Sequence, residues 1–161
     1  MSDVLCIYYS RSGRTKKVMT EIAQALDAEL VAIRDGQDRS GWKGYLRSGM
    51  EAMGRATRPI RPLNTEKTLE EYRLVLVGTP VWAGRCSSPV RALLKRRGLE
   101  LSRVGYVLTR DMERKYEEIY EQMDLYTARE HLLGVSLRPG DVGYPFWRDE
   151  FIQKVQQLLN R

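Results

Sequence analysis

Cysteine and histidine are scarce in this sequence, and their scarcity excludes several kinds of site. The chain has two cysteines, Cys6 and Cys86, which are too few for a disulfide framework and therefore favour a reducing, cytoplasmic environment. The single histidine, His131, has no cysteine or second histidine close to it in the sequence. We therefore predict no metal site, and we expect His131 to cap or flank a strand.

Long apolar segments are also missing. No run approaches the ~20 apolar residues that a membrane-spanning helix needs, and the short apolar stretch near the start follows Ser2 and Asp3, unlike a signal peptide. We therefore predict no membrane insertion. With 161 residues, the chain has room for one domain, residues 1–161, around a single substantial core.

Acidic residues are outnumbered, but the excess of positive charge does not by itself indicate a nucleic-acid partner. Lys and Arg number 27 against 21 Asp and Glu, which gives a formal net charge of +6. These charges are spread along the chain without a nucleic-acid-binding motif, so we predict no nucleic-acid partner. The most basic segment, 42–61, allows two interpretations: a solvated face, or a patch for an acidic partner or anionic substrate. Its charged residues are Lys43, Arg47, Glu51, Arg55, Arg58 and Arg61.

Two common glycine-rich phosphate motifs are absent, since the sequence contains neither G-x-x-x-x-G-K-[ST] nor G-x-G-x-x-G. What is present is the stretch Ser10–Thr15, between an apolar run at residues 4–9 and an amphipathic run at 16–26. The apolar run is typical of a buried parallel strand, and the spacing of Val18, Ile22 and Leu26 predicts a helix.

A strand followed by hydroxyls, a glycine and a helix is an arrangement that binds anions. The first turn of a helix has backbone N–H groups without internal partners, and the helix dipole favours negative charge there. The hydroxyls of Ser10, Ser12 and Thr15 add donors, and Gly13 allows a tight backbone turn. The stretch therefore predicts a phosphate-binding loop, with a purely structural turn as the alternative.

A thiol phosphatase loop is a further interpretation that the spacing disfavours. That loop needs one more residue between its cysteine and its arginine than the four that separate Cys6 from Arg11. Cys6 also falls in the middle of the predicted strand, where we expect its thiol to be buried away from a phosphate.

The rest of the chain alternates between apolar runs and amphipathic segments. We predict further strands at residues 28–33, 73–78, 104–108 and 132–137, and helices at 41–55, 89–94, 116–123 and 151–159. This alternation is typical of a doubly wound α/β fold of three layers, in which helices cover both faces of a five-stranded parallel sheet. Within 41–55, the large apolar residues recur at helical intervals and are expected to pack into the core, with a ligand-binding surface as the alternative. They are Trp42, Tyr45, Leu46, Met50 and Met53.

A second loop of interest follows the third predicted strand. In doubly wound sheets, ligands bind beyond the carboxyl ends of the strands, where the strand order reverses. This places the loop after the first strand beside Thr79–Gly84. Trp82 lies between Pro80 and Gly84, and a tryptophan held in this way can stack on a ring system. A loop tryptophan that fills a surface hollow is the alternative.

The two loops resemble the FMN-binding loops of the flavodoxin family. Their sequences are Tyr9-Ser10-Arg11-Ser12-Gly13-Arg14-Thr15 and Gly78-Thr79-Pro80-Val81-Trp82-Ala83-Gly84. The similarity extends in order and spacing over essentially the whole chain. It implies a flavodoxin-like sheet with strand order 2-1-3-4-5 and a non-covalent FMN as the cofactor. The residues that the resemblance assigns to FMN in these loops are Ser10, Arg11, Ser12, Gly13, Arg14, Thr15, Thr79, Pro80, Val81, Trp82, Ala83 and Gly84.

The third flavin loop of the family, after strand 4, is usually rich in small residues, whereas here Thr109–Tyr116 carries long charged side chains. The resemblance adds Thr109 and Arg110 to the FMN-binding residues. Either longer side chains cover the outer edge of the flavin or a partner chain supplies that wall, so we expect a monomer or a homodimer. We identify no catalytic acid, base or nucleophile, because in a flavin protein the cofactor carries the redox chemistry.

Positive charge in the site loops bears on the redox role. Low-potential flavodoxins are acidic as a family, whereas this chain places Arg11, Arg14, Arg85, Arg110 and Arg114 in or beside the loops. A unit charge ~8 Å away, at an effective dielectric of ~20, contributes about 2 kcal/mol. We therefore predict that reduced FMN forms at a less negative potential than in an acidic electron carrier.

Three functions agree with these features. The first is a redox protein that transfers electrons through FMN to a protein partner. The second is an FMN-dependent NAD(P)H oxidoreductase that acts on a quinone-like small-molecule acceptor, and the third is a binding module of the same fold without flavin. Cys86, just past the second loop, is interpreted as a packing residue, with a redox role as the alternative.

Overall fold

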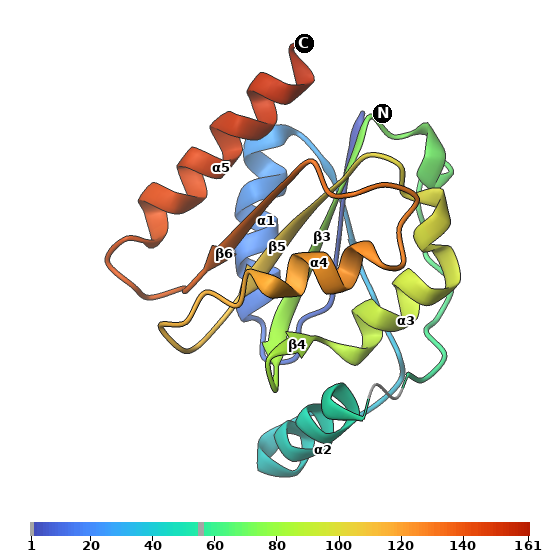
Figure 1. The fold of residues 1–161 in the computed structure, drawn as a ribbon, viewed down its shortest axis with the longest axis vertical. Helices are drawn as coiled ribbons and strands as arrows, with labels where there is room; N and C mark the ends of the chain where they lie inside the picture. The colour runs from blue at the N-terminus through green and yellow to red at the C-terminus, as the bar shows by residue number, and fades with distance from the viewer. Residues whose placement is uncertain (1, 55–56) are drawn as a thin grey trace.

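The computed structural model describes residues 2–54 and 57–161, which form a three-layer α/β fold (Figure 1). Within the described residues, the parallel strands are, in spatial order, β2 (Glu29–Ala32), β1 (Val4–Tyr8), β3 (Leu74–Trp82), β5 (Val104–Thr109) and β6 (Leu133–Leu137). A short additional strand, β4 (Arg85–Cys86), pairs antiparallel with β3, so the fourth and fifth parallel strands along the chain are numbered β5 and β6. The predicted doubly wound sheet and its strand order are therefore confirmed.

Helices cover both faces of the sheet. They are α1 (Arg14–Leu26), α2 (Gly41–Met53), α3 (Ser88–Arg97), α4 (Glu118–Asp124) and α5 (Tyr144–Leu159), with short 3₁₀ turns η1 (Leu69–Glu71) and η2 (Gly98–Glu100). One face is covered by α1 and α5 and the other by α3 and α4, while α2 lies at the end of the molecule opposite the two chain termini (Figure 1). No helix in the described part of the chain is long and apolar enough to cross a membrane.

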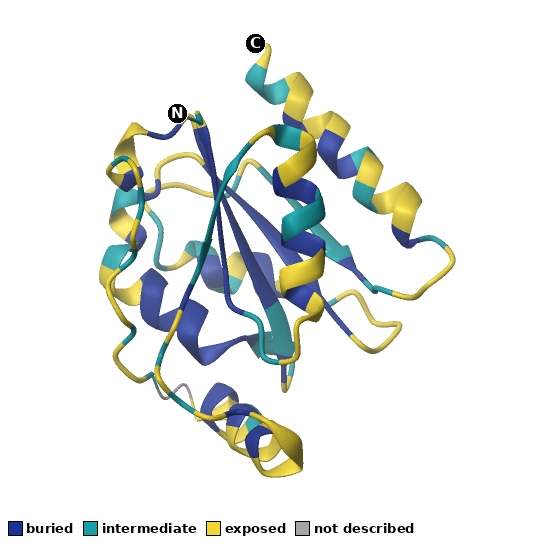
Figure 2. Cartoon of the chain, turned by 180° about the vertical axis from the view of Figure 1, so that it is seen from behind, coloured by how far each residue is buried: buried dark blue, intermediate teal, exposed yellow. Residues whose placement is uncertain are grey.

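Two buried cores flank the sheet, because alternate residues of each strand point to opposite faces. On β1, Cys6 packs in the core under α1 and α5 with Ile22, whereas Ile7 packs in the other core with Leu93. The parallel strands β1, β3 and β5 are buried on both faces, as their continuous apolar sequences predict (Figure 2). His131 lies shortly before β6, as expected, with its Nδ1 atom 2.7 Å from the carboxylate of Asp124.

The second predicted loop is a strand over most of its length. β3 continues through Thr79–Trp82, and the chain turns back at Ala83 and Gly84 into β4. Both turn residues have a positive φ, 50° and 73°, as a type I′ hairpin requires. The sequence did not indicate this turn because alanine rarely adopts a positive φ. The expectation of a loop is therefore wrong for Thr79–Trp82.

The expectation that the apolar side chains of residues 41–55 pack into the core is also wrong. Large apolar side chains of α2 are exposed, among them Trp42 at 70% and Met50 at 72%, and exposed residues lie on the outer side of this helix in Figure 2. Arg55, where the predicted helix ends, lies outside the described residues. The side that α2 buries is small and polar, and consists of Gly44, Ser48, Glu51 and Ala52.

Candidate functional site

The turn between β1 and α1 has the form of an anion-binding loop. Gly13 has a φ of 97°, and its N–H donates to the hydroxyl of Ser10 at 3.0 Å, which closes the turn. Within the described residues, no side chain caps the N-terminus of α1 and no acidic residue lies in its first turn. In contrast, α3 is capped by Ser87, which accepts the N–H of Val90. The start of α1 therefore keeps its amide groups and positive dipole end available to an anion.

Trp82 directly precedes the turn of the β3–β4 hairpin, is held on two sides and is only 7% exposed. Its ring packs edge-on against Tyr9, with the ring centroids 5.5 Å apart and an interplanar angle of 85°. The guanidinium of Arg39 lies over the same ring, 5.1 Å from its centroid. Little of the indole is therefore left to contact a ligand, which differs from the open loop tryptophan expected from the sequence.

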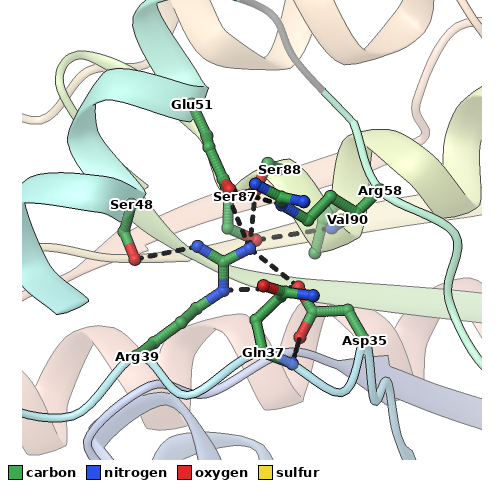
Figure 3. Close-up of polar contacts among 9 residues, drawn as sticks. All are labelled: Asp35, Gln37, Arg39, Ser48, Glu51, Arg58, Ser87, Ser88 and Val90. Carbon is green, nitrogen blue, oxygen red and sulfur yellow. Dashed lines mark hydrogen bonds and ion pairs between the residues drawn. The ribbon is translucent and has the colours of Figure 1, made fainter.

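Arg39 is at the centre of a buried polar cluster behind this hairpin (Figure 3). Its guanidinium forms ion pairs with Asp35 at 2.7 Å and Glu51 at 2.6 Å, and it donates to the hydroxyl of Ser48 at 3.1 Å. Ser88 of α3 donates to Glu51 at 3.1 Å. The cluster therefore joins the segment after β2, helix α2 and helix α3 at the edge of the site.

The contacts within this cluster determine the protonation states of Glu51 and Arg39. Burial by itself would raise the pKa of the Glu51 carboxyl, but hydrogen bonds from Arg58 and Arg39 bring it below its ordinary value. Burial also opposes the charge on Arg39, yet its hydrogen bonds to Asp35 and Glu51 raise the pKa of the guanidinium. Arg39 and Glu51 are therefore both ionised at neutral pH, and their attraction offsets the cost of burying two charges.

The loop after β5 is tied to α1 and is stabilised by an arginine. The hydroxyls of Thr109 and Thr15 are buried and lie 2.7 Å apart, so the last residue of β5, where the loop begins, contacts the first turn of α1 directly. Arg110 donates to the hydroxyl of Ser136 at 2.9 Å and to the carbonyl oxygen of Met112 at 2.6 Å. The side chain of Arg110 therefore organises the loop in which it lies.

A cavity of about 400 Å³ lies where the three loops and helix α2 meet. An ion pair between Arg14 and Asp111 joins α1 to the loop after β5 along its wall. The cavity thus brings together most of the residues assigned from the sequence. Those that line it are Arg11, Ser12, Arg14, Thr15, Pro80, Val81, Trp82, Ala83, Gly84, Thr109 and Arg110.

The other assigned residues, Ser10, Gly13 and Thr79, are not part of the lining. Ser10 and Gly13 form the hydrogen bond that closes the β1–α1 turn. Thr79 is fully buried, and its hydroxyl accepts the N–H of Ser87 at 2.9 Å, which joins the end of β3 to the start of α3. These three residues shape the site from outside the cavity.

The apolar wall contributed by α2 agrees with the alternative interpretation of residues 41–55, a ligand-binding surface, and not with the expected packing into the core. Helical periodicity in residues 41–55 indicated an amphipathic helix, but periodicity alone does not show which side faces the core. Ser48 and Glu51 lie on the side of the helix opposite the apolar residues. Their burial against Arg39 is what turns the apolar side outward, but it could be inferred from the sequence only if that buried partner were known. The additional residues that line the cavity are Tyr45, Leu46, Gly49, Met50, Met53, Asp111, Met112 and Tyr116.

A second cavity, of about 410 Å³, lies beside the first and shares Arg110 with it. Apart from Arg110, it contains none of the residues assigned from the sequence, so the first cavity is the candidate site. In the lining of the second cavity, acidic and basic side chains are equal in number. Besides Arg110, its charged residues are Glu113, Lys115, Glu117, Arg138, Asp141, Glu150 and Lys154.

Neither cysteine is suited to thiol chemistry in the site. Burial raises the pKa of Cys6 to about 12 and that of Cys86 to about 11, so both are protonated thiols at neutral pH. A thiolate is the nucleophilic form of cysteine. The structure therefore supports the interpretation of Cys86 as a packing residue and disfavours a phosphatase loop around Cys6.

Comparison with known proteins agrees with this geometry. A family model described as flavodoxin matches residues 3–99, which contain both the β1–α1 turn and the β3–β4 hairpin. No curated protein matches the sequence.

Several solved structures resemble this one at low sequence identity, which shows a shared fold. A flavoprotein from Lactobacillus acidophilus in complex with FMN has 21% identity and a TM-score of 0.67, with 91% of this chain and 99% of that chain covered. A WrbA-like flavodoxin from Agrobacterium tumefaciens has 11% identity and a TM-score of 0.61, with 98% and 97% covered. The NAD(P)H:quinone oxidoreductase from Methanothermobacter marburgensis has 12% identity and a TM-score of 0.52, with 98% and 97% covered.

Proposed function

The chain belongs to the flavodoxin family, and from this premise we propose that it binds one FMN non-covalently and transfers electrons through it. The phosphate is bound by the β1–α1 turn, where Arg11, Ser12 and the first amides of α1 are the donors. The ring system is bound by the β3–β4 hairpin, in which the buried Trp82 contributes only its small exposed part, by the apolar wall of α2 and by the loop after β5. FMN, when bound, supplies the redox chemistry, and the chain supplies binding, orientation and electrostatics.

The observation that carries this proposal is one cavity shared by the uncapped start of α1 and the hairpin that holds Trp82. FMN combines an anionic phosphate with a flat aromatic ring system, so it needs both kinds of surface within one site. The wall formed by α2 is apolar and includes Met50 and Met53, which suits a ring system and would not suit a sugar phosphate.

The visible absorption spectrum of the purified protein is the primary test. We expect a yellow protein that releases FMN on denaturation. A colourless protein that takes up neither FMN nor riboflavin when these are added would contradict the proposal and would support a flavin-free binding module of the same fold.

A substitution in the phosphate loop tests how the flavin is held. Ser12→Glu places a carboxylate beside the expected phosphate, so we expect FMN to bind at least about tenfold more weakly while riboflavin, which has no phosphate, is little affected. Ser102→Glu is the matched control, because Ser102 is exposed and lies outside the cavity. Equal effects of Ser12→Glu on FMN and riboflavin would show that this loop does not bind the phosphate.

A second candidate function is the reduction of a small apolar acceptor, such as a quinone, by NAD(P)H. Two observations favour it: the apolar wall that α2 adds to the cavity, and the similarity to the quinone oxidoreductase. Oxidation of NADPH by the purified flavoprotein with a quinone, without an added reductase, is the measurement. Turnover supports the enzyme, whereas reduction only by a separate reductase protein supports an electron carrier.

A further inference from the structure

Helix α2 carries its large apolar side chains on the outside, which is the reverse of an ordinary surface helix. Each of these side chains is more than half exposed, and together they form what we call the α2 apolar face. A contiguous exposed apolar surface of this kind marks an interaction site. The face consists of Trp42, Tyr45, Leu46, Met50 and Met53.

The opposite side of α2 is held inward by buried polar contacts. Arg39 is 3% exposed and binds both Ser48 and Glu51 of the helix (Figure 3). Arg91 of α3, which is also buried, donates to the carbonyl oxygen of Ala52 at 3.1 Å. Turning the apolar face inward would break these contacts and leave the buried charge of Arg39 without its partner on the helix. The outward orientation is therefore a fixed property of the fold.

The exposed charges of α2 are all positive. Lys43 and Arg47 are exposed, whereas Glu51, the single acidic residue of the helix, is buried. The ammonium group of Lys43 lies 5.9 Å from the ring centroid of Trp42, so a cation and an aromatic ring share one edge of the face. The α2 apolar face and its flanking cations therefore match a partner that has negative charges on its outside and an apolar layer below them.

We propose that α2 docks on an anionic lipid surface, with the α2 apolar face at the level of the interface and Lys43 and Arg47 at the head groups. A helix with tryptophan, leucine and methionine on one side and basic residues beside them has the composition of helices that lie in a membrane interface. α2 is also at one end of the molecule in both views, so it can contact a deformable surface without a matching groove (Figures 1 and 2). A second copy docked symmetrically on this face would bring the same cations together.

This docking places the candidate site next to the lipid. Four of the five residues of the α2 apolar face also line the cavity: Tyr45, Leu46, Met50 and Met53. Trp42 is the member of the face that lies outside the cavity lining. An apolar acceptor dissolved in the bilayer would reach the cavity along this face. The docking itself does not rest on the proposed redox function, so it is measured with and without bound flavin.

Sedimentation with lipid vesicles is the test. We expect the protein to sediment with vesicles of phosphatidylcholine and phosphatidylglycerol, to stay in solution with phosphatidylcholine alone, and to bind less as the salt concentration rises. The double substitution Lys43→Gln and Arg47→Gln should weaken binding about 25-fold, since each basic residue near an anionic surface contributes about fivefold. Trp42→Ser with Met50→Ser should weaken it about tenfold or more.

Matched controls change similar residues elsewhere on the surface. Lys95→Gln with Arg96→Gln removes two exposed cations from α3, and Leu125→Ser removes an exposed apolar side chain, so these variants should bind as the unchanged protein does. Circular dichroism establishes that every variant is folded. FMN uptake by the Lys43→Gln with Arg47→Gln variant, whose changes lie outside the cavity lining, reports separately on the proposed function.

Three results would overturn the proposal. One is the absence of sedimentation with anionic vesicles at low salt, or an equal loss in the control variants. The second is a concentration-dependent dimer that Trp42→Ser with Met50→Ser abolishes, which would assign the face to a second copy. The third is binding to poly-L-glutamate in place of vesicles, which would assign it to an acidic protein.

Discussion

At the scale of single residues, Arg39 connects parts of the candidate site that are far apart in the sequence. Its guanidinium lies over Trp82 of the hairpin and pairs with Glu51 of α2, while its carbonyl oxygen accepts a hydrogen bond from Arg11 at 3.4 Å. No sequence motif marks this residue, because its partners come from an irregular segment and from two helices. Sequence motifs identified residues that line the cavity but not the residue that positions them.

Removing the Arg39 guanidinium is expected to destabilise the protein strongly. Arg39→Met leaves the carboxylates of Asp35 and Glu51 without their buried partner, and breaking a buried ion pair in this way costs about 3–5 kcal/mol. The free energy of unfolding from urea titration is the measurement. Arg47→Met, an exposed residue of α2, is the control and should change stability by less than about 0.5 kcal/mol. A loss below about 1 kcal/mol for Arg39→Met would show that the cluster is not needed for stability.

The two buried thiols are expected to make stability fall at high pH. Burial raises the pKa from 9.0 to about 12 for Cys6 and to about 11 for Cys86. The folded state therefore holds these protons more tightly than the unfolded state, so the stabilisation is complete below about pH 9 and is lost as the pH rises through the folded pKa values. Unfolding titrations between pH 8 and about 11 measure this decline.

Thiol labelling gives an independent check on the same two residues. At pH 8 neither cysteine should react with a thiol reagent in the folded protein, and both should react after unfolding in urea. Rapid labelling of Cys86 in the folded protein would contradict its assignment as a packing residue. A Cys86→Ala variant distinguishes its reaction from that of Cys6.

At the scale of elements, the sequence predicts best where local and tertiary signals agree. β1 and α1 were predicted because an apolar run, a glycine turn and an amphipathic run follow one another, and the structure buries each as the pattern requires. The extension of β3 depends on its pairing with β4, which local propensity does not reveal. The burial of the polar side of α2 likewise depends on Arg39. This residue precedes the helix, and its ion pair with Glu51 forms only through tertiary contacts, which local sequence patterns do not reveal.

Packing between α1 and β3 depends on a glycine, and this gives a test at the scale of elements. A Cβ atom on Gly78 would lie 2.5 Å from the sulfur of Met19 and 2.7 Å from its Cγ atom. We therefore expect Gly78→Ala to cost about 1–3 kcal/mol in the free energy of unfolding. The control is Gly49→Ala, which adds the same group in open space on a helix and should stabilise by up to about 1 kcal/mol.

A double-mutant cycle identifies the contact responsible. Met19→Ala alone leaves a cavity and should cost about 2–5 kcal/mol. Combined with Gly78→Ala, it should cost less than the sum of the two single effects, because the truncated side chain no longer meets the added methyl group. Strict additivity would mean that Gly78 is needed for a reason other than its distance from Met19.

At the scale of the whole molecule, the order of strands and helices was predictable, whereas the effective charge of the site was not. Alternating strands and helices specify the parallel sheet because their crossovers are right-handed and the helices must cover both faces. Charge depends on tertiary pairing: Arg14 pairs with Asp111, and Arg114 pairs with Glu118. Arg11 and Arg110 both line the cavity, and neither forms an ion pair within the described residues. Arg110 donates to Ser136 and to the carbonyl oxygen of Met112 in its own loop, so Arg11 is the cation that we expect to act on a ligand.

The charge of Arg11 is expected to tune the redox potential of bound FMN. Two-electron reduction of FMN adds negative charge, so a nearby guanidinium favours the reduced form and Arg11→Gln should make the midpoint potential more negative. A unit charge near the site in a partly screened environment corresponds to a shift of about 10–40 mV for a two-electron couple. Spectroelectrochemical titration measures it, and the shift should shrink at high salt because Arg11 is half exposed. Lys95→Gln on α3 removes a charge outside the cavity and should leave the potential unchanged. An unchanged or less negative potential for Arg11→Gln would show that the positive charge of this loop serves the phosphate and does not act on the ring system.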